Sequence, residues 1–357
     1  MAQPSRIDAV RAVMRERNLD ALLVTNRDNV GWLSGFTGSS GFVVVTGDRA
    51  IFATDSRYTE QAKTQCPGFD LTKLATSAPE EVTTLLADLK AANIGFEADH
   101  LTVRMHEVYR AALPPQIAFT PTTGIVDTLR LVKDAGEIRL IEEAVALADR
   151  TFDHILPSLA PGAVERDIML EMEWFMRKKG ADVAFDTIVA SGPRSALPHG
   201  RAADRVLQTG DFVTLDFGAR LQGYCSDITR TVVLGEPTAE QRKVYGTVLA
   251  ALEKALVAVR PGASGKDVDA IARDYINEAG YGDYFGHGLG HSLGRAVHDG
   301  PGFSVRSELT LAEGMVLTLE PGIYIPGWGG VRIEHDIVVE NNGTRILDIS
   351  PIDLIAR

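Results

Sequence analysis

The chain has 357 residues, 45% of them hydrophobic and 24% charged, which allows two domains with substantial cores and excludes a disordered, collagenous or fibrous protein. A formal charge of -12 would repel a phosphate backbone, so nucleic acid is not an expected partner. The charged amino-terminal segment and the lack of an apolar run of about 20 residues indicate neither a signal peptide nor a membrane span. Cys66 and Cys225 are expected to be buried thiols in a reducing compartment, and we expect a cytoplasmic protein.

In the first third of the chain, short apolar runs alternate with helical patterns, as is typical of an α/β domain. The patterns predict strands over 21–25, 41–46, 50–54 and 94–97, and helices over 56–65 and 79–91. Proline and glycine at 113–115 and 120–124 predict breaks in regular structure. We therefore expect a domain boundary near 125–132 and divide the chain into an α/β domain, 1–125, and a second domain, 126–357.

A capped helix is predicted at the start of the second domain. Asp134 can accept hydrogen bonds from first-turn amides, and Glu137 stands three residues later, where it completes a capping box. The helix should cover about 135–156.

The second domain contains an internal repeat of about a hundred residues. Pro-Gly-Ala occurs at 161–163 and again at 261–263, and each copy precedes a predicted helix, over 165–179 and 266–279. Residues 207–218 (LQTGDFVTLDFG) align with 311–322 (LAEGMVLTLEPG) with five identities, and the alignment places Asp216 opposite Glu320. Duplication of packed strands is enough to explain the apolar identities, but it does not explain the acids.

Each half of the repeat has an acid on each of two predicted strands. Asp216 and Glu320 lie at the ends of apolar runs, and Asp227 and Glu334 lie in the strands expected next, over 224–233 and 330–339. Four buried carboxylates would raise one another's pKa values strongly unless cations lay between them. Two divalent metal ions would balance this charge.

A glycine-rich segment offers nitrogen ligands to the same site. Residues 285–299 (FGHGLGHSLGRAVHD) contain His287, His291 and His298. A single histidine would more often be a satisfied core residue, but three of them beside glycines, which allow close backbone approach, favour a site. Carboxylates with one imidazole suit manganese or cobalt, with zinc also compatible. Two metals about 3.5 to 4 Å apart can hold a hydroxide that attacks a carbonyl, so hydrolysis is the expected chemistry.

These residues resemble the creatinase, methionine aminopeptidase and prolidase group, whose catalytic domain has the pita-bread fold. The resemblance covers the whole chain through LDFG, SDITRT, HGLGHSLG, LEPGIY and RIEHDIVV, which hold Asp216, Asp227, His291, Glu320 and Glu334. It implies an α+β pita-bread catalytic domain behind a smaller α/β creatinase-type domain.

The resemblance also implies roles for the site residues. Asp216 would hold one metal, His291 and Glu320 the other, and Asp227 and Glu334 would bridge both, with Glu320 passing a proton to the leaving nitrogen. His199, His287 and His298 would position the substrate, and His199 and His298 would assist catalysis by stabilising the developing oxyanion. Arg332 and Arg306 are further substrate-binding candidates.

Several positions depart from the group's pattern or are weaker candidates. Arg295 stands where an aliphatic residue is usual, and His335 stands where aspartate is common. Residues 31–45 and 52–62 are similar to the amino-terminal domain of aminopeptidase P and small prolidases, which simple methionine aminopeptidases lack. In the group this domain covers an active site and limits substrate length, so we expect a homodimer. Arg57 and Tyr58 are weak candidates for ligand contacts.

The expected activity is dimetal-dependent removal of the residue before proline, as in Xaa-Pro aminopeptidase, on short proline-containing peptides. The main alternative is a strict Xaa-Pro dipeptidase, which needs a cation for the proline carboxylate. Arg306 or Arg295 could supply it, although Gly302 stands where some dipeptidases of the group have arginine. A metal-free creatinase-like amidinohydrolase and a non-catalytic binding module remain less favoured alternatives.

Overall fold

The computed structural model describes residues 5–76 and 79–357, and it forms two compact units, Met1–Arg130 and Leu131–Arg357. The division therefore lies after Arg130, inside the 125–132 segment and a few residues beyond the domain end expected at 125. Helix α6 (Ile125–Leu131) contains this point.

The first unit is a sheet of six strands in the order β4-β3-β2-β1-β5-β6, with apolar clusters from both of its faces. Its strands are β1 (Ala21–Val24), β2 (Phe42–Thr46), β3 (Ala50–Asp55), β4 (Asp70–Leu74), β5 (Asn93–Glu97) and β6 (Ala118–Thr122). The other helices of this unit are α1 (Arg6–Glu16), α2 (Arg27–Ser34), α3 (Thr59–Gln65), α4 (Pro79–Asp88) and α5 (Val103–Ala112). The α/β alternation predicted from the sequence is present.

Three predicted boundaries in this unit are wrong. The break expected at 120–124 is occupied by the end of β6, which tolerates Pro121 because it is an edge strand paired only with β5. Helix α3 begins at Thr59 because Asp55 holds residues 55–58 in a turn, accepting hydrogen bonds from the backbone and side chain of Arg57. Helix α4 ends at Asp88, ahead of the left-handed backbone of Lys90 (φ 56°).

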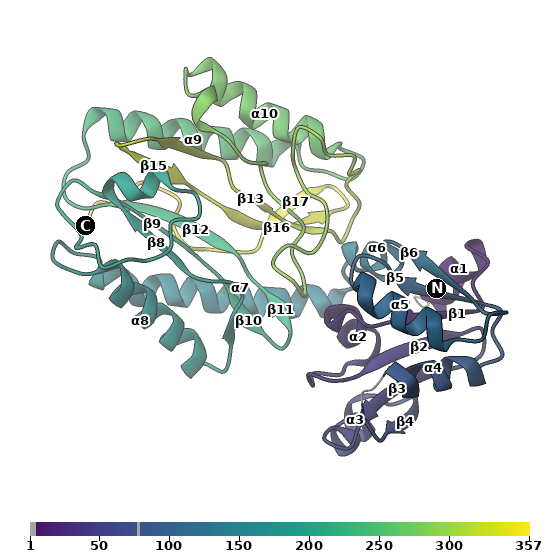
Figure 1. Ribbon diagram of the computed structural model, residues 1–357. Coiled ribbons are helices and arrows are strands. Elements are labelled where there is room, and N and C mark those ends of the chain that lie inside the picture. The colour runs from purple at the N-terminus through teal and green to yellow at the C-terminus, as the bar shows by residue number, and fades with distance from the viewer. Residues whose placement is uncertain (1–4, 77–78) are drawn as a thin grey trace. The chain divides into compact units, whose positions relative to one another are not determined.

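The second unit contains two helix pairs that flank its strands on opposite sides (Figure 1). Helix α7 (Ala135–Ile155) packs against α8 (Glu165–Lys178), and α9 (Ala239–Ala258) packs against α10 (Gly265–Glu278). The capping box of Asp134 and Glu137 is confirmed, and helix η1 (Leu156–Ser158) continues α7. Gly162 and Gly262, in the repeated Pro-Gly-Ala turns, both have positive φ (99° and 83°), which explains why both turns use glycine.

The strands between the helices repeat as well. Sheet β12-β9-β8 belongs to the first half, sheet β13-β16-β17 to the second, and the ribbons β11-β10-β7 and β14-β15 flank them. The strands are β7 (Asp182–Val183), β8 (Ile188–Ser191), β9 (Phe212–Phe217), β10 (Ala219–Leu221), β11 (Tyr224–Cys225), β12 (Ile228–Val233), β13 (Val316–Leu319), β14 (Gly322–Ile325), β15 (Gly329–Arg332), β16 (His335–Glu340) and β17 (Gly343–Ile346). Short helices η2 (Gly192–Ala196) and η3 (Gly282–Tyr284) complete the unit.

The two strands predicted over 224–233 and 330–339 are each broken in two. The first divides into β11 and β12 around Asp227, and the second into β15 and β16 around Glu334. A residue between two strands is released from the pleat that alternates side chains between faces. Both breaks therefore occur at an acid predicted to bind metal.

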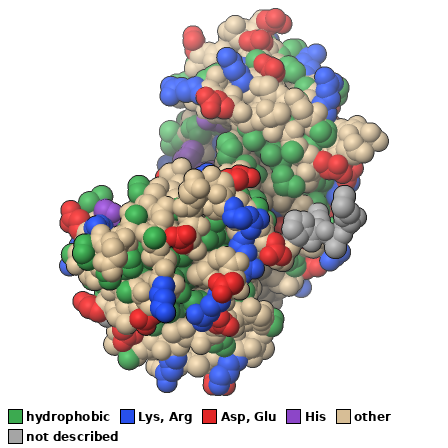
Figure 2. All heavy atoms as spheres, turned by 90° about the vertical axis from the view of Figure 1, so that its right-hand side faces the viewer, with side chains coloured by type: hydrophobic (Ala, Val, Ile, Leu, Met, Phe, Trp, Pro, Cys, Tyr) green, Lys and Arg blue, Asp and Glu red, His purple; other side chains and the backbone are tan. Residues whose placement is uncertain are grey.

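The surface carries charges of both signs. On the face shown in Figure 2, acidic and basic side chains are interspersed, despite the net charge of -12. Exposed ion pairs such as Arg49–Asp70 (2.8 Å) contribute little to stability because water screens them. Within residues 5–76 and 79–357, none of the helices combines the length and apolar character that crossing a lipid bilayer requires.

Candidate metal centre

A cavity of about 560 Å³ in the second unit contains the five predicted metal ligands in its wall. These are Asp216, Asp227, His291, Glu320 and Glu334. His199, His287, His298 and Arg332 line the same cavity. Side chains separated by more than a hundred positions in the sequence are therefore brought to one surface.

Strand alternation points Asp216 toward this cavity. Val213, Leu215 and Phe217 of β9 belong to the apolar cluster that includes residues of α7 and α8. Because successive side chains alternate, Thr214 and Asp216 face the other side of the sheet. Glu320 directly follows β13, whose Leu317 and Leu319 belong to the cluster of the second half. Each half thus turns one acid away from its own helices.

The two halves of the repeat join beside the cavity through β12. The backbone N–H of Glu334 donates to the Thr229 carbonyl at 3.3 Å, and the Thr231 hydroxyl donates to the Arg332 carbonyl at 2.9 Å. These bonds fix the segment containing Glu334 against the strand that follows Asp227. Both interrupted strands therefore meet at the acids.

Three of the acids form a tight cluster. Ligand oxygens of Asp216, Asp227 and Glu334 all lie within 4.8 Å of one another, and the last two residues are buried. Burial, and then the neighbouring carboxylates, raises the pKa of Asp227 and of Glu334 far above the usual values. Burial also raises the pKa of Glu320 to about 7. In the protein without cations, this cluster disfavours its own ionisation.

His291 is oriented to present one nitrogen to the acids. Its Nδ1 lies 3.2 Å from the Ser292 carbonyl, which can only accept, so the proton is on Nδ1. Nε2 is then left as a lone-pair donor, 3.4 Å from Asp227 Oδ2 and 3.4 Å from Glu320 Oε1. A second hydrogen bond that fixes the ring in this way is usual for metal-binding histidines.

The residues fit a divalent cation centre. The Thr229 hydroxyl donates to Glu334 Oε2 at 2.7 Å, whereas Glu334 Oε1 is buried and accepts no hydrogen bond from the described part of the chain. A buried carboxylate oxygen without a donor is costly unless a cation satisfies it. Four carboxylates and one imidazole form a hard donor set, suited to manganese, cobalt or zinc ions.

Arg332 is directed at protein groups around the acids. Its guanidinium is buried, donates to Asp216 Oδ2, and donates to the Tyr324 hydroxyl at 2.7 Å, to the Thr229 hydroxyl at 3.0 Å and to the Pro198 carbonyl at 3.2 Å. These contacts hold Asp216, so the arrangement supports a positioning role more directly than the substrate contact expected from the sequence. Tyr324 and Thr229 were not predicted from the sequence as site residues, although they lie in the motifs LEPGIY and SDITRT.

The three other histidines of the cavity differ in their surroundings. His287 Nδ1 donates to the Gly288 carbonyl at 2.8 Å, so Nε2 accepts from Tyr324 at 2.9 Å. Burial lowers the pKa of His287 to about 4, which keeps its ring neutral. The ring of His298 packs edge-on against His291, with 4.2 Å between centroids, and partial burial lowers its pKa as well. His199 and His298 remain exposed.

Three further positions singled out in the sequence, Arg295, Arg306 and His335, are not among the residues that line this cavity. The Arg295 guanidinium lies over the Tyr224 ring at 5.4 Å. His335 bonds to Asp348 at 2.8 Å. In the first unit, Arg57 pairs with Asp55 at 2.8 Å and Tyr58 bonds to Ser39 at 2.6 Å.

Glycines allow the segments of the cavity wall to approach closely. A Cβ at Gly290 would meet the Thr318 carbonyl oxygen, and a Cβ at Gly302 would meet the Gly290 carbonyl oxygen and the Cα of His291. The expected function of the glycines around His291 is therefore present in the structure.

Comparison with known proteins identifies the family of the chain. The family described as Metallopeptidase family M24 matches residues 139–341, and the Creatinase/Prolidase N-terminal domain matches residues 6–132. The chain is 37% identical to the Xaa-Pro dipeptidase of Pyrococcus horikoshii, over 98% of both chains. It superposes on the solved Xaa-Pro dipeptidase from Bacillus anthracis with a TM-score of 0.96 and 45% identity over 99% of both chains. The solved X-Pro aminopeptidase from Thermotoga maritima has a TM-score of 0.91 and 39% identity, over 98% of this chain and 99% of its own.

These matches confirm the family resemblance, the pita-bread fold and the enzyme class expected from the sequence motifs. The catalytic match covers more than half of the chain and includes all the predicted metal ligands. The chain is therefore a metalloexopeptidase of family M24, with a creatinase/prolidase amino-terminal domain ahead of its pita-bread catalytic domain.

Proposed function

We propose that the chain is an Xaa-Pro dipeptidase that uses two divalent metal ions. The observation that carries the proposal is the convergence of Asp216, Asp227, His291, Glu320 and Glu334 on one wall of a cavity of about 560 Å³. A cavity of this size is in the range that holds small ligands. The names of the Pyrococcus horikoshii and Bacillus anthracis relatives support the dipeptide substrate.

Each ligand has a proposed place in the centre. Asp216 would hold one ion, His291 and Glu320 the other, and Asp227 and Glu334 would bind both, with Mn²⁺ the preferred ion and Co²⁺ or Zn²⁺ compatible. Two such ions act as Lewis acids toward a peptide carbonyl. Glu320 is the proposed proton carrier to the leaving nitrogen, and His199 and His298 donate to the developing oxyanion.

A proline-containing substrate suits the rest of the cavity. An Xaa-Pro bond has no amide hydrogen and a fixed φ, so backbone pairing cannot hold it in place. The apolar side chains of Phe185, Ile188 and Phe303 line the cavity together with His287 and can accept the ring. The substrate would therefore be held by shape and by the metal centre.

The cation for a dipeptide carboxylate cannot come from position 302. Any side chain there would collide with Gly290 and His291, so the arginine that some dipeptidases have at this place is excluded with this backbone. Of the lysines and arginines in the described residues, those lining this cavity are Arg201 and Arg332, and Arg332 is engaged with Asp216. Arg201 is therefore the proposed carboxylate partner.

Arg201 is available to a substrate because its own ion pair is exposed. Its guanidinium lies 2.5 Å from Asp186, and the two side chains are 81% and 69% exposed. Water screening makes such a pair weak, so a substrate carboxylate can compete for the guanidinium. Both residues line the cavity.

The second candidate is the Xaa-Pro aminopeptidase expected from the sequence. The Thermotoga maritima relative and the glycine at 302 favour it, because an aminopeptidase needs no anchor for the proline carboxylate. We further propose a homodimer, a substrate-limiting role for the amino-terminal domain and a cytoplasmic location, as the resemblance implies.

Turnover of matched peptides tests the substrate. After chelation we expect turnover to stop. Added Mn²⁺ should restore turnover, and Co²⁺ and Zn²⁺ are tested for comparison. A charge-assisted hydrogen bond to the carboxylate should make kcat/KM for Xaa-Pro about tenfold or more above that for Xaa-Pro-Xaa. Xaa-Ala serves as the control for proline. Preference for the tripeptide would select the aminopeptidase, and turnover unaffected by chelation would select the metal-free alternative.

Replacement of Arg201 tests the carboxylate anchor separately. Arg201→Gln should raise KM for Xaa-Pro by about tenfold and leave hydrolysis of Xaa-Pro-amide unchanged, because the amide lacks the charge. Arg166→Gln is the matched control, since Arg166 forms an exposed pair with Asp204 and does not line the cavity. Equal effects of Arg201→Gln on the acid and the amide would contradict this assignment.

A further inference from the structure

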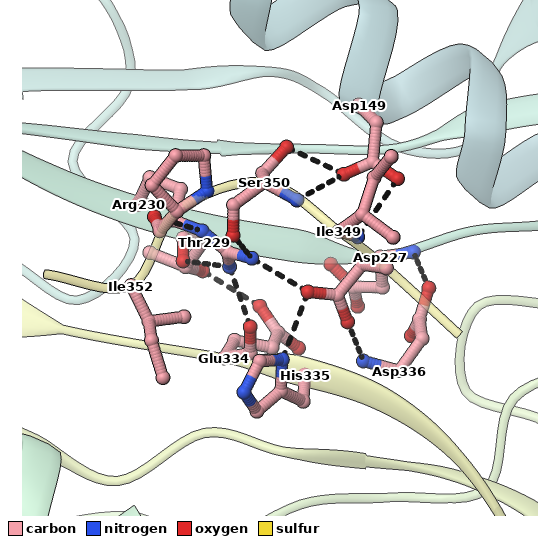
Figure 3. Close-up of polar contacts among 12 residues, drawn as sticks. Asp149, Asp227, Thr229, Arg230, Glu334, His335, Asp336, Ile349, Ser350 and Ile352 are labelled. Carbon is pink, nitrogen blue, oxygen red and sulfur yellow. Dashed lines mark hydrogen bonds and ion pairs between the residues drawn. The ribbon is translucent and has the colours of Figure 1, made fainter. Parts of the chain in front are cut away.

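Arg230 of β12 is buried behind the acids with every donor satisfied. Its side chain is 1% exposed, and a guanidinium has five N–H donors. Nε donates to Pro351 O (3.0 Å), Nη1 to Thr229 O (3.0 Å) and Glu334 O (2.6 Å), and Nη2 to Asp348 Oδ2 (2.6 Å) and Ser350 O (2.8 Å). Figure 3 shows Arg230 beside Thr229, Glu334 and Ser350.

The acceptors of Arg230 connect the carboxy-terminal segment to a metal ligand. Three of them belong to residues 348–351, and the Glu334 carbonyl belongs to the ligand itself. Thr229, the residue before Arg230, holds Glu334 from the other end through its hydroxyl. Glu334 is thus fixed at its backbone and at its carboxylate from one short segment of β12.

Asp348 extends the connection to the second shared ligand. Its Oδ2 accepts from Arg230 and, at 2.8 Å, from His335 Nδ1, while its Oδ1 accepts from the Asp336 backbone N–H at 3.0 Å. Asp336 Oδ2 then accepts from the Asp227 backbone N–H at 2.9 Å. All these side chains are buried, and Figure 3 shows Asp227, Arg230, His335 and Asp336 together. Asp227 and Glu334 are therefore held by one network.

We propose that Arg230, Asp336 and Asp348 are positioning residues, which set the placement of Asp227 and Glu334 and thereby the affinity of the metal centre. Residues 348–351 near the carboxy terminus therefore contribute to the metal centre through this network, although none of them lines the cavity. Partners behind the ligands orient them, and their loss typically costs about 10- to 100-fold in metal affinity. The inference rests on the ligands assigned under the proposed function.

The test measures Co²⁺ binding to the metal-free full-length chain, by calorimetry and by the absorption spectrum of the bound ion. Asp348→Asn leaves one acceptor oxygen where the carboxylate had two, and Arg230→Lys keeps the charge with three donors in place of five. Both should bind Co²⁺ about 10- to 100-fold more weakly and change its spectrum, which reports ligand geometry.

Tyr245→Phe is the matched control for the carboxy-terminal segment. Tyr245 of α9 donates to the Ile352 carbonyl at 2.8 Å and so anchors the same segment without reaching a ligand. The Tyr245→Phe variant should have a lower melting temperature than the parent but the same Co²⁺ affinity and the same spectrum of bound Co²⁺. Equal weakening by Tyr245→Phe, or parent-like binding by Asp348→Asn, would overturn the inference. If Arg230→Lys does not fold, the result for Asp348→Asn by itself tests the inference. If the parent chain binds no Co²⁺, the proposed ligand set is wrong.

Discussion

Glu334→Ala should remove turnover together with metal binding. The substitution deletes a carboxylate proposed to bind both ions and takes away the acceptor of the Thr229 hydroxyl. Metal charge stabilisation is worth several kcal/mol of a reaction barrier, so kcat should fall by about a thousandfold or more. Metal analysis after dialysis against Mn²⁺ should find fewer than two ions per chain. Kinetics on an Xaa-Pro dipeptide measures the accompanying loss.

Glu340→Ala is the control for this change because it alters the same residue type at the end of β16, the strand that directly follows Glu334. Glu340 is exposed and pairs with Arg345 at 2.6 Å, away from the cavity. It should retain the parent's metal content and turnover. Melting of the metal-free forms shows whether Glu334→Ala remains folded. Two ions per chain with normal turnover in Glu334→Ala would show that Glu334 is not a ligand.

Gly302→Ala should damage the metal centre although position 302 carries no ligand. The added Cβ would lie against the Gly290 carbonyl oxygen and the Cα of His291, so the backbone must move. Overpacking of this kind costs about 1 to 3 kcal/mol of stability. A displacement of about 1 Å at His291 would lower kcat by about a hundredfold. Thermal unfolding, Co²⁺ titration and turnover measure the three effects.

Gly286→Ala is the matched control, in the glycine-rich segment 285–299 that contains His291. No atom lies within 4 Å of a Cβ built at Gly286, so this alanine has room. Its stability, Co²⁺ affinity and turnover should stay close to those of the parent. If the Gly302→Ala protein has the Co²⁺ affinity and turnover of the parent, the loop can adapt to the added Cβ. The close approach of residues 290 and 302 would then not be required for function.

The sequence was informative where a local pattern is tied to local structure. Asp134 and Glu137 predicted the start of α7 because a capping box depends on residues only three positions apart. The alternation in β9 separated Leu215 and Phe217, which pack toward the helices, from Asp216. The internal repeat identified the acids as corresponding pairs because both halves use the same arrangement of helices and strands.

Where prediction failed, a contact between distant segments decided the outcome. Proline at 121 predicts a break, but β6 has only one neighbour, β5, so the missing donor costs nothing there. The breaks at Asp227 and Glu334 arise where the two halves join and release those residues from their ladders. Apart from the carbonyl of the adjacent Thr229, the acceptors of Arg230 lie more than a hundred positions further along the chain, and no spacing rule connects them.

By itself, the sequence determined the family, the α/β pattern of the first unit, the internal repeat of the second and the five residues proposed for the metal centre, because motifs and periodicity are properties of neighbouring residues and the repeat appears when the sequence is aligned with itself. The tertiary structure alone decided which donors surround those residues: Thr229 on Glu334, Arg332 on Asp216, and Arg230 with Asp348 behind them. Hydrogen bonds between segments depend on where the packed core places each backbone, and that placement is fixed by the whole fold.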